Sequence, residues 1–269
     1  MKQKKTSNKQ PVALVTGASS GIGWAVSELL LQEGFQVYGL SRRGTCPEGA
    51  VGISADVSSE ESVKAAVDRV LAQAGKIDLL INNAGFGISG PVEFTASADA
   101  FDQMQVNFMG QFYVAKAVLP AMRERKKGRI VFVSSVAGEM AIPYQAFYSA
   151  AKAAVNSLAL ALRNEVKDFH IRISSVMPGD AKTGFTAVRR KDSSGDSVYK
   201  KNVSAVKAME KDEQNGMSPE DVARVILKAT KACFPAPMYI AGSKYKVFHV
   251  LYKLLPSRLI YWIIGKMYS

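Results

Sequence analysis

Short apolar runs alternate with segments of helical periodicity along most of the chain, and this alternation restricts the fold more than any other feature of the sequence. Each run is typical of a strand buried on both faces. Strands separated by helices are typical of a parallel sheet covered on both faces by crossover helices, so we expect a doubly wound α/β fold. The expected strands lie at 12–16, 35–41, 50–56, 77–83, 128–135 and 171–179, and the expected helices at about 21–33, 59–74, 98–124 and 147–166, with a further one beginning near Ser218.

The 269 residues suit one large domain, which we place at 11–243. Residues 1–10 are basic and polar, without the apolar segment of a secretory signal, and are expected to form a flexible arm. The two cysteines, Cys46 and Cys233, are too few for a disulfide framework and have no metal-like spacing. We therefore expect a reducing, cytoplasmic location and no metal site.

The segment after the first expected strand, TGASSGIG at 16–23, is rich in glycine and opens a helix. Ligands of doubly wound sheets bind at the carboxyl ends of the strands, and the N–H groups of a helix N-terminus there favour a pyrophosphate. We expect dinucleotide binding, although the spacing is G-x-x-x-G-x-G rather than G-x-G-x-x-G. The letters also fit the G-x-S-x-G elbow of a hydrolase, for which only His170 and His249 are available as the base. The expected cofactor contacts here are Gly17, Ser19, Ser20, Gly21, Ile22 and Gly23.

Arginines follow the second expected strand, where an NAD-preferring site would carry an acidic residue. No Asp or Glu stands there, and Ser41, Arg42 and Arg43 occupy the position instead. Because a guanidinium group suits the 2′-phosphate, NADP(H) is expected in preference to NAD(H). Two solvated arginines in a loop are the alternative. Asp56 and Asn83, after the third and fourth strands, could equally satisfy local backbone groups.

Several short motifs follow one another in order: TGASSGIG, NNAG at 82–85, SSVAG at 134–138, YSAAK at 148–152 and PGDAKT at 178–183. In this order and spacing they resemble the short-chain dehydrogenase/reductase family over about residues 11–242. The resemblance implies a Rossmann-like sheet of seven parallel strands in the order 3-2-1-4-5-6-7, and an oxidoreductase that uses NADP(H). It implies Asn107, Ser135, Tyr148 and Lys152 as catalytic residues, and Asp56, Val57, Asn83, Ala84, Gly85, Tyr148, Lys152, Pro178, Gly179, Ala181 and Thr183 as further cofactor contacts.

Tyr148 and Lys152 are four residues apart at the start of an expected helix, so both side chains can reach one site. A tyrosine titrates near 10, and action as a base at neutral pH requires its pKa to fall by roughly three units, or about 4 kcal/mol. A cation at about 4 Å supplies roughly this much. The resemblance implies that Tyr148 is the general acid and base, that Lys152 lowers its pKa and holds the cofactor ribose, and that Ser135 hydrogen-bonds the substrate oxygen. Asn107 would anchor a water relay to the lysine.

Residues 183–217 form a long, polar and charge-mixed segment, which we expect to be a mobile lid over the substrate. The expected function is NADPH-dependent reduction of a ketone or aldehyde, or oxidation of the secondary alcohol. An NADP(H)-binding sensor or scaffold, acting through its tail at a membrane or partner, is the alternative. A bulky apolar substrate such as a steroid or lipid-like ketone is favoured by the apolar candidates for the pocket wall, Ile142, Phe147, Phe185 and Val188.

The net charge of +12 is unevenly distributed, because no acidic residue follows Asp221. The tail at 244–269 is basic and amphipathic, and three alternatives remain open: it packs over the substrate entrance or a neighbouring subunit, it lies on an anionic membrane surface, or it is disordered. Interleaved apolar residues argue against nucleic-acid binding. The family resemblance suggests a homodimer or homotetramer. The apolar residues at helical spacing in the tail are Val247, Val250, Leu251 and Leu254, and Pro256 divides it.

Overall fold

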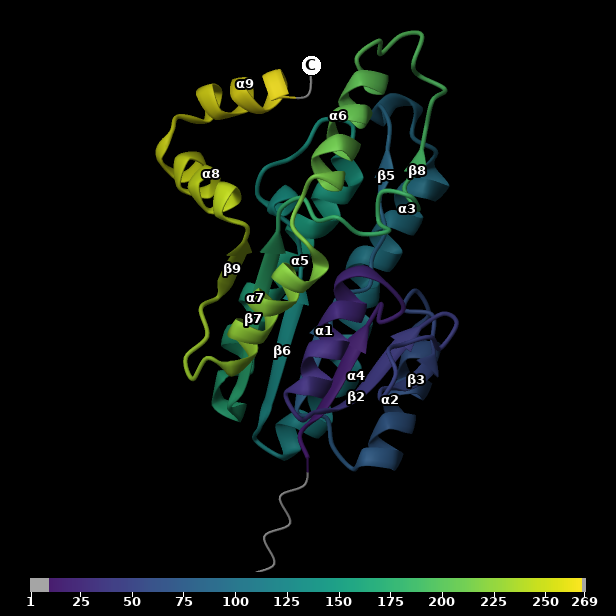
Figure 1. Cartoon of the computed structure of the whole chain (residues 1–269), viewed down its shortest axis with the longest axis vertical. Helices are drawn as coiled ribbons and strands as arrows, with labels where there is room; N and C mark the ends of the chain where they lie inside the picture. Colours follow the sequence, from purple (N-terminus) through teal and green to yellow (C-terminus); the bar gives the residue numbers. More distant parts are fainter. Residues whose placement is uncertain (1–9, 268–269) are drawn as a thin grey trace, which may run out of the picture.

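A seven-stranded parallel sheet forms the centre of the computed structural model, which describes residues 10–267 (Figure 1). The strand order is β3-β2-β1-β4-β6-β7-β9, which is the predicted order once the strands of this sheet are counted along the chain. Residues 1–9 of the expected arm and the last two residues of the tail lie outside the described part. The strands are β1 (Val12–Thr16), β2 (Gln36–Ser41), β3 (Val51–Ser54), β4 (Leu79–Asn82), β6 (Gly128–Val133), β7 (Ile171–Pro178) and β9 (Met238–Ala241).

Helices cover both faces of this sheet, because the side chains of each strand alternate between two apolar clusters. In β1, Val12 and Leu14 pack into one cluster, whereas Ala13 and Val15 pack into the other. The predicted α/β class with two covering layers is confirmed. The first face is covered by α2 (Glu60–Ala74), α4 (Gly110–Glu124) and α5 (Ala146–Glu165), and the second by α1 (Gly21–Gln32) and α7 (Pro219–Lys231).

The helix expected at 98–124 is divided into three segments: α3 (Ser97–Met104), a π-helical turn η2 (Gln105–Met109) and α4. Within the π-helical turn, the buried Asn107 side chain bonds twice to the backbone of Phe86. Its Oδ1 accepts from Phe86 N at 3.0 Å and its Nδ2 donates to Phe86 O at 2.8 Å. Single π-helical turns of this kind are frequent at functional sites. Here the two bonds tie the helix to the loop that follows β4.

The segment 183–217, expected to be a lid, contains regular structure. β8 (Arg190–Lys191) pairs with β5 (Ile88–Ser89) in a second, two-stranded parallel sheet, and α6 (Asn202–Gln214) follows it. One face of α6 is buried, which anchors the segment to the domain. Three short 3₁₀ turns complete the remaining elements: η1 (Val92–Phe94), η3 (Val136–Gly138) and η4 (Lys167–Phe169).

The tail forms two helices, α8 (Ser243–Leu254) and α9 (Ser257–Met267), which lie beyond the carboxyl end of β9 (Figure 1). The chain is divided at Pro256, as predicted. One side of the two helices packs on the domain in a third apolar cluster, through Tyr245, Phe248, Tyr252, Ile260 and Ile264. The four apolar residues noted at helical spacing are exposed; they are Val247, Val250, Leu251 and Leu254. Among residues 10–267, no helix combines the length and the apolarity needed to cross a bilayer.

Candidate active site

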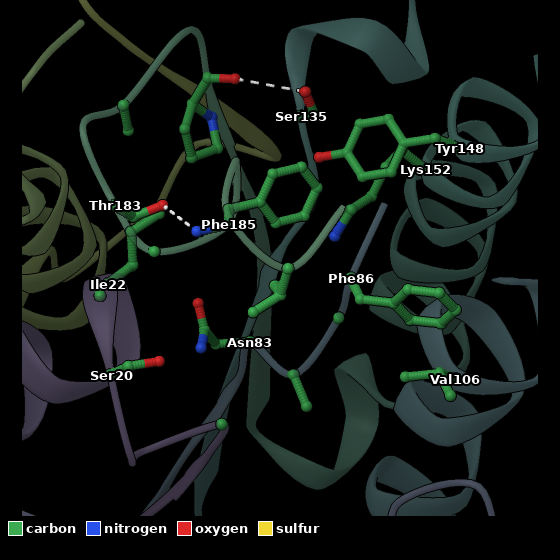
Figure 2. A pocket seen from close by; sticks show the side chains of 18 of the residues that line it. Ser20, Ile22, Asn83, Phe86, Val106, Ser135, Tyr148, Lys152, Thr183 and Phe185 are labelled. Atoms are coloured by element: carbon green, nitrogen blue, oxygen red, sulfur yellow. Dashed lines mark hydrogen bonds between the residues drawn. The ribbon is translucent and has the colours of Figure 1, made fainter. Parts of the chain in front are cut away.

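A cavity of about 900 Å³ opens along the carboxyl ends of the central strands (Figure 2). This volume lies in the range of small-molecule and cofactor sites. All the residues predicted for the site line the cavity except Asn107 and Gly23. Those that do so are Gly17, Ser19, Ser20, Gly21, Ile22, Ser41, Arg42, Arg43, Asp56, Val57, Asn83, Ala84, Gly85, Ser135, Tyr148, Lys152, Pro178, Gly179, Ala181 and Thr183.

The loop between β1 and α1 has the backbone conformation and the amides that a phosphate group needs. Gly17 and Gly21 have φ values of +68° and +55°, in the left-handed region that favours glycine. Ser20, the N-cap of α1, makes no side-chain capping hydrogen bond, so it does not occupy the first N–H groups of the helix. A pyrophosphate fits this cradle, since it is anionic and the N-terminus is the positive end of the helix.

Ser41, Arg42 and Arg43 lie where β2 ends at the cavity. The buried Ser41 hydroxyl donates to Thr45 O at 3.0 Å, whereas both arginines are exposed. Within residues 10–267, neither guanidinium group forms an ion pair. The two positive charges are therefore available to an anionic ligand at this end of the cavity.

Ser135, Tyr148 and Lys152 come together on one wall of the cavity, although they belong to two elements (Figure 2). Ser135 follows the end of β6, and the other two lie in the first turns of α5. The Ser135 hydroxyl donates to Pro178 O at 3.5 Å, and its interaction with the Tyr148 phenol lowers the pKa of that phenol. The buried Lys152 ammonium donates to Val133 O at 2.9 Å, and its Nζ lies 5.8 Å from the centroid of the Tyr148 ring. A hydroxyl, a phenol and an ammonium thus converge on one space.

The direction of the Tyr148 pKa differs from the expectation. Burial raises the pKa of Tyr148 to about 12, the bond from Ser135 offsets only part of this, and the nearby carboxylate of Glu213 raises it further. Burial also lowers the pKa of Lys152 to about 8. Loss of hydration dominates the pKa of the phenol, and the Lys152 ammonium is bonded to a backbone carbonyl, so the role of Lys152 in lowering the phenol's pKa stays a prediction. At neutral pH the phenol keeps its proton, which is the form a proton donor requires.

Both the sequence and the fold match known proteins. A family model described as short chain dehydrogenase matches residues 11–194, more than half of the chain. The chain belongs to this family. A 3-ketodihydrosphingosine reductase of Bacteroides thetaiotaomicron is 40% identical over 225 residues, which are 81% of this chain and 82% of that protein. A retinol dehydrogenase 8 of Bos taurus is 31% identical over 273 residues, which are 92% of this chain and 86% of that protein.

A solved short-chain dehydrogenase of Streptomyces avermitilis has the same fold, with a TM-score of 0.82 and 30% identity over 90% of this chain and 92% of that one. Members of the family are oxidoreductases that act on CH–OH and C=O groups and bind nicotinamide cofactors. The chain is therefore a short-chain dehydrogenase/reductase and an enzyme of this class.

Two residues predicted for this short-chain dehydrogenase lie behind the cavity wall. Asn107 reaches the cavity only through its bonds to the backbone of Phe86, which is itself a wall residue. Gly23 supports the glycine loop, because a Cβ at this position would stand 2.1 Å from Gly17 O. Both positions therefore shape the wall through packing or through a neighbour.

Asp56 and Asn83 line the cavity, and each also bonds to neighbouring groups: Asp56 to its own turn and Asn83 to the end of β1. The Asp56 carboxylate accepts from the backbone N and the hydroxyl of Ser58, at 2.9 Å and 2.7 Å. The Asn83 side chain donates to Thr16 O at 3.0 Å. These bonds fix the turns after β3 and β4 at the edge of the cavity.

The sequence reasoning missed wall residues from the segment 183–217 and its surroundings. Met209 and Glu213, both on α6, line the cavity, and so does Asp180 within the PGDAKT motif. Glu213 forms an ion pair with the buried Arg189. A usable signal was present, because the apolar positions of 202–214 recur at helical spacing and Met209 lies on that face.

Two further expectations concern residues near the wall. Of the four apolar candidates, Ile142, Phe185 and Val188 line the cavity, but Phe147 does not, so this part of the prediction is wrong. Phe147 is one residue before Tyr148 on α5 and therefore points about 100° away from it. Neither histidine proposed for a hydrolase lines the cavity, which leaves Ser19 without a base.

Proposed function

We propose that this short-chain dehydrogenase reduces a bulky, apolar ketone or aldehyde with NADPH and oxidises the corresponding secondary alcohol in reverse. The observation that carries the proposal is the convergence of Ser135, Tyr148 and Lys152 on one wall of a cavity whose other end has a phosphate cradle. A neutral phenol beside a hydroxyl is the arrangement that a carbonyl oxygen needs when it is protonated.

In this proposal the bound nicotinamide supplies a hydride to the carbonyl carbon. The Ser135 hydroxyl and the Tyr148 phenol hold the carbonyl oxygen by hydrogen bonds, and the phenol proton passes to that oxygen as its negative charge develops. The Lys152 ammonium, held at Val133 O, stabilises the phenolate that remains. Asn107 acts indirectly, by fixing the Phe86 backbone on the wall.

The preference for NADP(H) is the finer part of the proposal. Support comes from Arg42 and Arg43, whose exposed guanidinium groups have no ion-pair partner in the described residues and can take a 2′-phosphate. The adenine would contact Asp56 and Val57, and Thr183 would contact the carboxamide of the nicotinamide.

The substrate class rests on the apolar part of the wall and on similar proteins. Ile142, Phe185, Val188 and Met209 line the cavity, and the Phe185 ring centroid lies 5.5 Å from that of Tyr148. The names of two relatives, a 3-ketodihydrosphingosine reductase and a retinol dehydrogenase, refer to lipid-like molecules. We propose a substrate of this kind, covered by movement of residues 183–217.

The location and assembly of the protein are further proposals. Cys46 and Cys233 are both free thiols, which supports a reducing compartment such as the cytoplasm. A homodimer or homotetramer is proposed from the family. Peripheral membrane contact through residues 244–269 has no support from the comparisons, and only the surface of α8 and α9 bears on it.

Steady-state turnover with a ketone panel tests the proposal, from small diketones to steroids and long-chain keto-lipids, each with NADPH and with NADH. We expect turnover that prefers NADPH and the larger apolar ketones. In Arg42→Ala, KM for NADPH should rise about 10–100-fold, because one charged hydrogen bond to the 2′-phosphate is lost. KM for NADH should change little, since NADH has no 2′-phosphate. Arg69→Ala, an exposed arginine on α2, is the matched control.

An equal loss with both cofactors would contradict the role of Arg42 as a 2′-phosphate ligand. If no compound turns over although NADPH binds tightly, the sensor or scaffold alternative is supported instead.

A further inference from the structure

Exposed large apolar side chains are concentrated on the two tail helices. No other pair of neighbouring helices in residues 10–267 carries as many. All of them are exposed after the tail has packed on the domain, and we refer to them as the outer face of the tail. Its members are Val247, Val250, Leu251, Leu254, Leu259, Tyr261, Trp262 and Met267.

The outer face is exposed because a different side of the same helices is already docked. Ile260 and Ile264 are 2% and 4% exposed, in a cluster that includes Met177 at the end of β7. Two polar contacts fix the same orientation: the Tyr245 phenol donates to Asp180, and His249 Nδ1 lies 2.5 Å from a Glu139 oxygen. An apolar outer face therefore remains after the tail has packed, which points to a partner outside the chain.

The charge of the tail restricts the kind of partner. Five basic residues lie on α8 and α9, and no acidic residue occurs after Asp221. A second copy of this surface would bring two sets of like charges together, which opposes self-association. An anionic surface is the complementary partner. The basic residues are Lys244, Lys246, Lys253, Arg258 and Lys266.

The arrangement of side chains selects a lipid surface rather than a polar polyanion. Leu254 and Trp262 are 75% and 61% exposed, and at 100° per residue the lysines of α8 flank its exposed apolar positions on both sides. Aromatic and aliphatic side chains together with Lys and Arg are typical of helices that lie in the membrane interface. The helices have 12 and 11 residues, so each is long enough to lie on a bilayer and too short to cross it.

We propose that the outer face of the tail binds the surface of an anionic lipid bilayer. Binding of the outer face to a bilayer does not depend on the proposed reaction, but it would affect how a substrate reaches the cavity. Tyr245 packs against Gly179, a residue of the cavity wall, so membrane binding holds the cavity beside the bilayer. A lipid-like ketone would then enter from the membrane, a consequence that rests on the proposed function.

Flotation of the full chain with vesicles tests the contact without any measurement of turnover. We expect binding to vesicles of phosphatidylcholine and phosphatidylglycerol in equal amounts, at least about tenfold weaker binding to phosphatidylcholine alone, and weaker binding at high salt. Leu254→Ser with Trp262→Ser should reduce binding about tenfold or more, because both side chains lose apolar burial in the interface. Unchanged NADPH binding by this variant shows that the domain is intact.

Phe234→Ser with Val198→Ser is the matched control, since these side chains are 92% and 66% exposed elsewhere on the molecule. Its vesicle binding should equal that of the unaltered chain. Equal binding by both double variants would overturn the proposal. A second outcome would also overturn it: the unaltered chain binds no vesicles, and Leu254→Ser with Trp262→Ser changes the oligomeric state measured without lipid. That result would identify a second copy of the chain as the partner.

Discussion

The two sides of the cavity differ in how their residues are held. On the cofactor side, most wall residues follow strands of the central sheet, and the central strands behind them are buried, as Val15 and Val133 are. On the substrate side, much of the wall comes from α6 and the loop before it, at residues such as Phe185, Val188 and Met209. The first side is fixed by the core of the domain, whereas the second is added at its edge.

This difference separates the chemistry from its specificity. Residues that must hold a position to a fraction of an ångström, such as Ser135 and Lys152, stand on the rigid side. Residues proposed to meet the variable part of a substrate, such as Met209, stand on α6, which lies outside the central sheet. Substitutions on the cofactor side should therefore lower turnover or stability more than equivalent substitutions on the substrate side.

The largest effect is expected for Lys152→Met on the rigid side. We predict a fall in turnover of about 10²–10³-fold, since the phenolate would lose a buried cation worth about 3–4 kcal/mol. Because burial lowers the pKa of Lys152 to about 8, its charge is present below that pH and lost above it. The rate of carbonyl reduction by the unaltered enzyme should therefore fall as pH rises through about 8.

Lys152→Met should remove this alkaline limb, whereas Lys64→Met, which alters an exposed lysine on α2, should keep both the rate and the limb. A variant at position 152 that retains the full rate and the same pH profile would contradict the role of the ammonium.

A smaller effect is expected for Gly23→Ala in the glycine loop. The new methyl group would stand 2.1 Å from Gly17 O, a backbone atom, so the loop must shift. We predict a loss of about 1–3 kcal/mol in the free energy of unfolding and weaker NADPH binding, measured by denaturant titration and by titration with the cofactor. Gly184→Ala, in the substrate-side segment, has no atom within 4 Å of the new group and should change stability by less than about 0.5 kcal/mol. Equal effects of the two changes would remove the distinction between the sides.

The smallest effect on global stability is expected for Ile260→Ala in the tail. Ile260 is 2% exposed, but its cluster lies at the edge of the domain, so its loss should release the tail before the sheet. Hydrogen exchange should become faster in 243–267 and remain unchanged in β1 and β4. Leu259→Ala, at a 43% exposed position, should change the exchange rates neither of 243–267 nor of β1 and β4. Faster exchange in β1 after Ile260→Ala would show that the tail is part of the same cooperative unit.

The cofactor side could be predicted from the sequence because its signals are local. The strand expected at 12–16 is the observed β1, and the residues expected after the first, second and fourth strands, such as Gly17, Arg42 and Asn83, line the cavity. A buried parallel strand is a continuous apolar run, and its end necessarily lies at the ligand edge of the sheet. Placement of these residues therefore required no knowledge of the tertiary contacts.

The substrate side could not be predicted in the same way. Both sides of α8 are apolar, with Tyr245 and Phe248 on one and Val250 and Leu254 on another, so periodicity alone could not decide which side packs. The pKa direction of Tyr148 also depends on tertiary placement, because burial and Glu213 of α6 raise it. The spacing of residues within one helix shows neither which side of α8 packs nor in which direction the pKa of Tyr148 shifts.

The most direct test of the central claim is the single-turnover rate of NADPH oxidation by Tyr148→Phe, with an accepted ketone and saturating cofactor. The account predicts that NADPH and the ketone still bind, since the ring remains, and that the rate falls about 10²–10⁴-fold because the proton donor is lost. Tyr199→Phe, which removes a phenol bonded to Glu93 on the surface, should leave the rate unchanged. A Tyr148→Phe variant that oxidises NADPH at the rate of the unaltered enzyme would contradict the account.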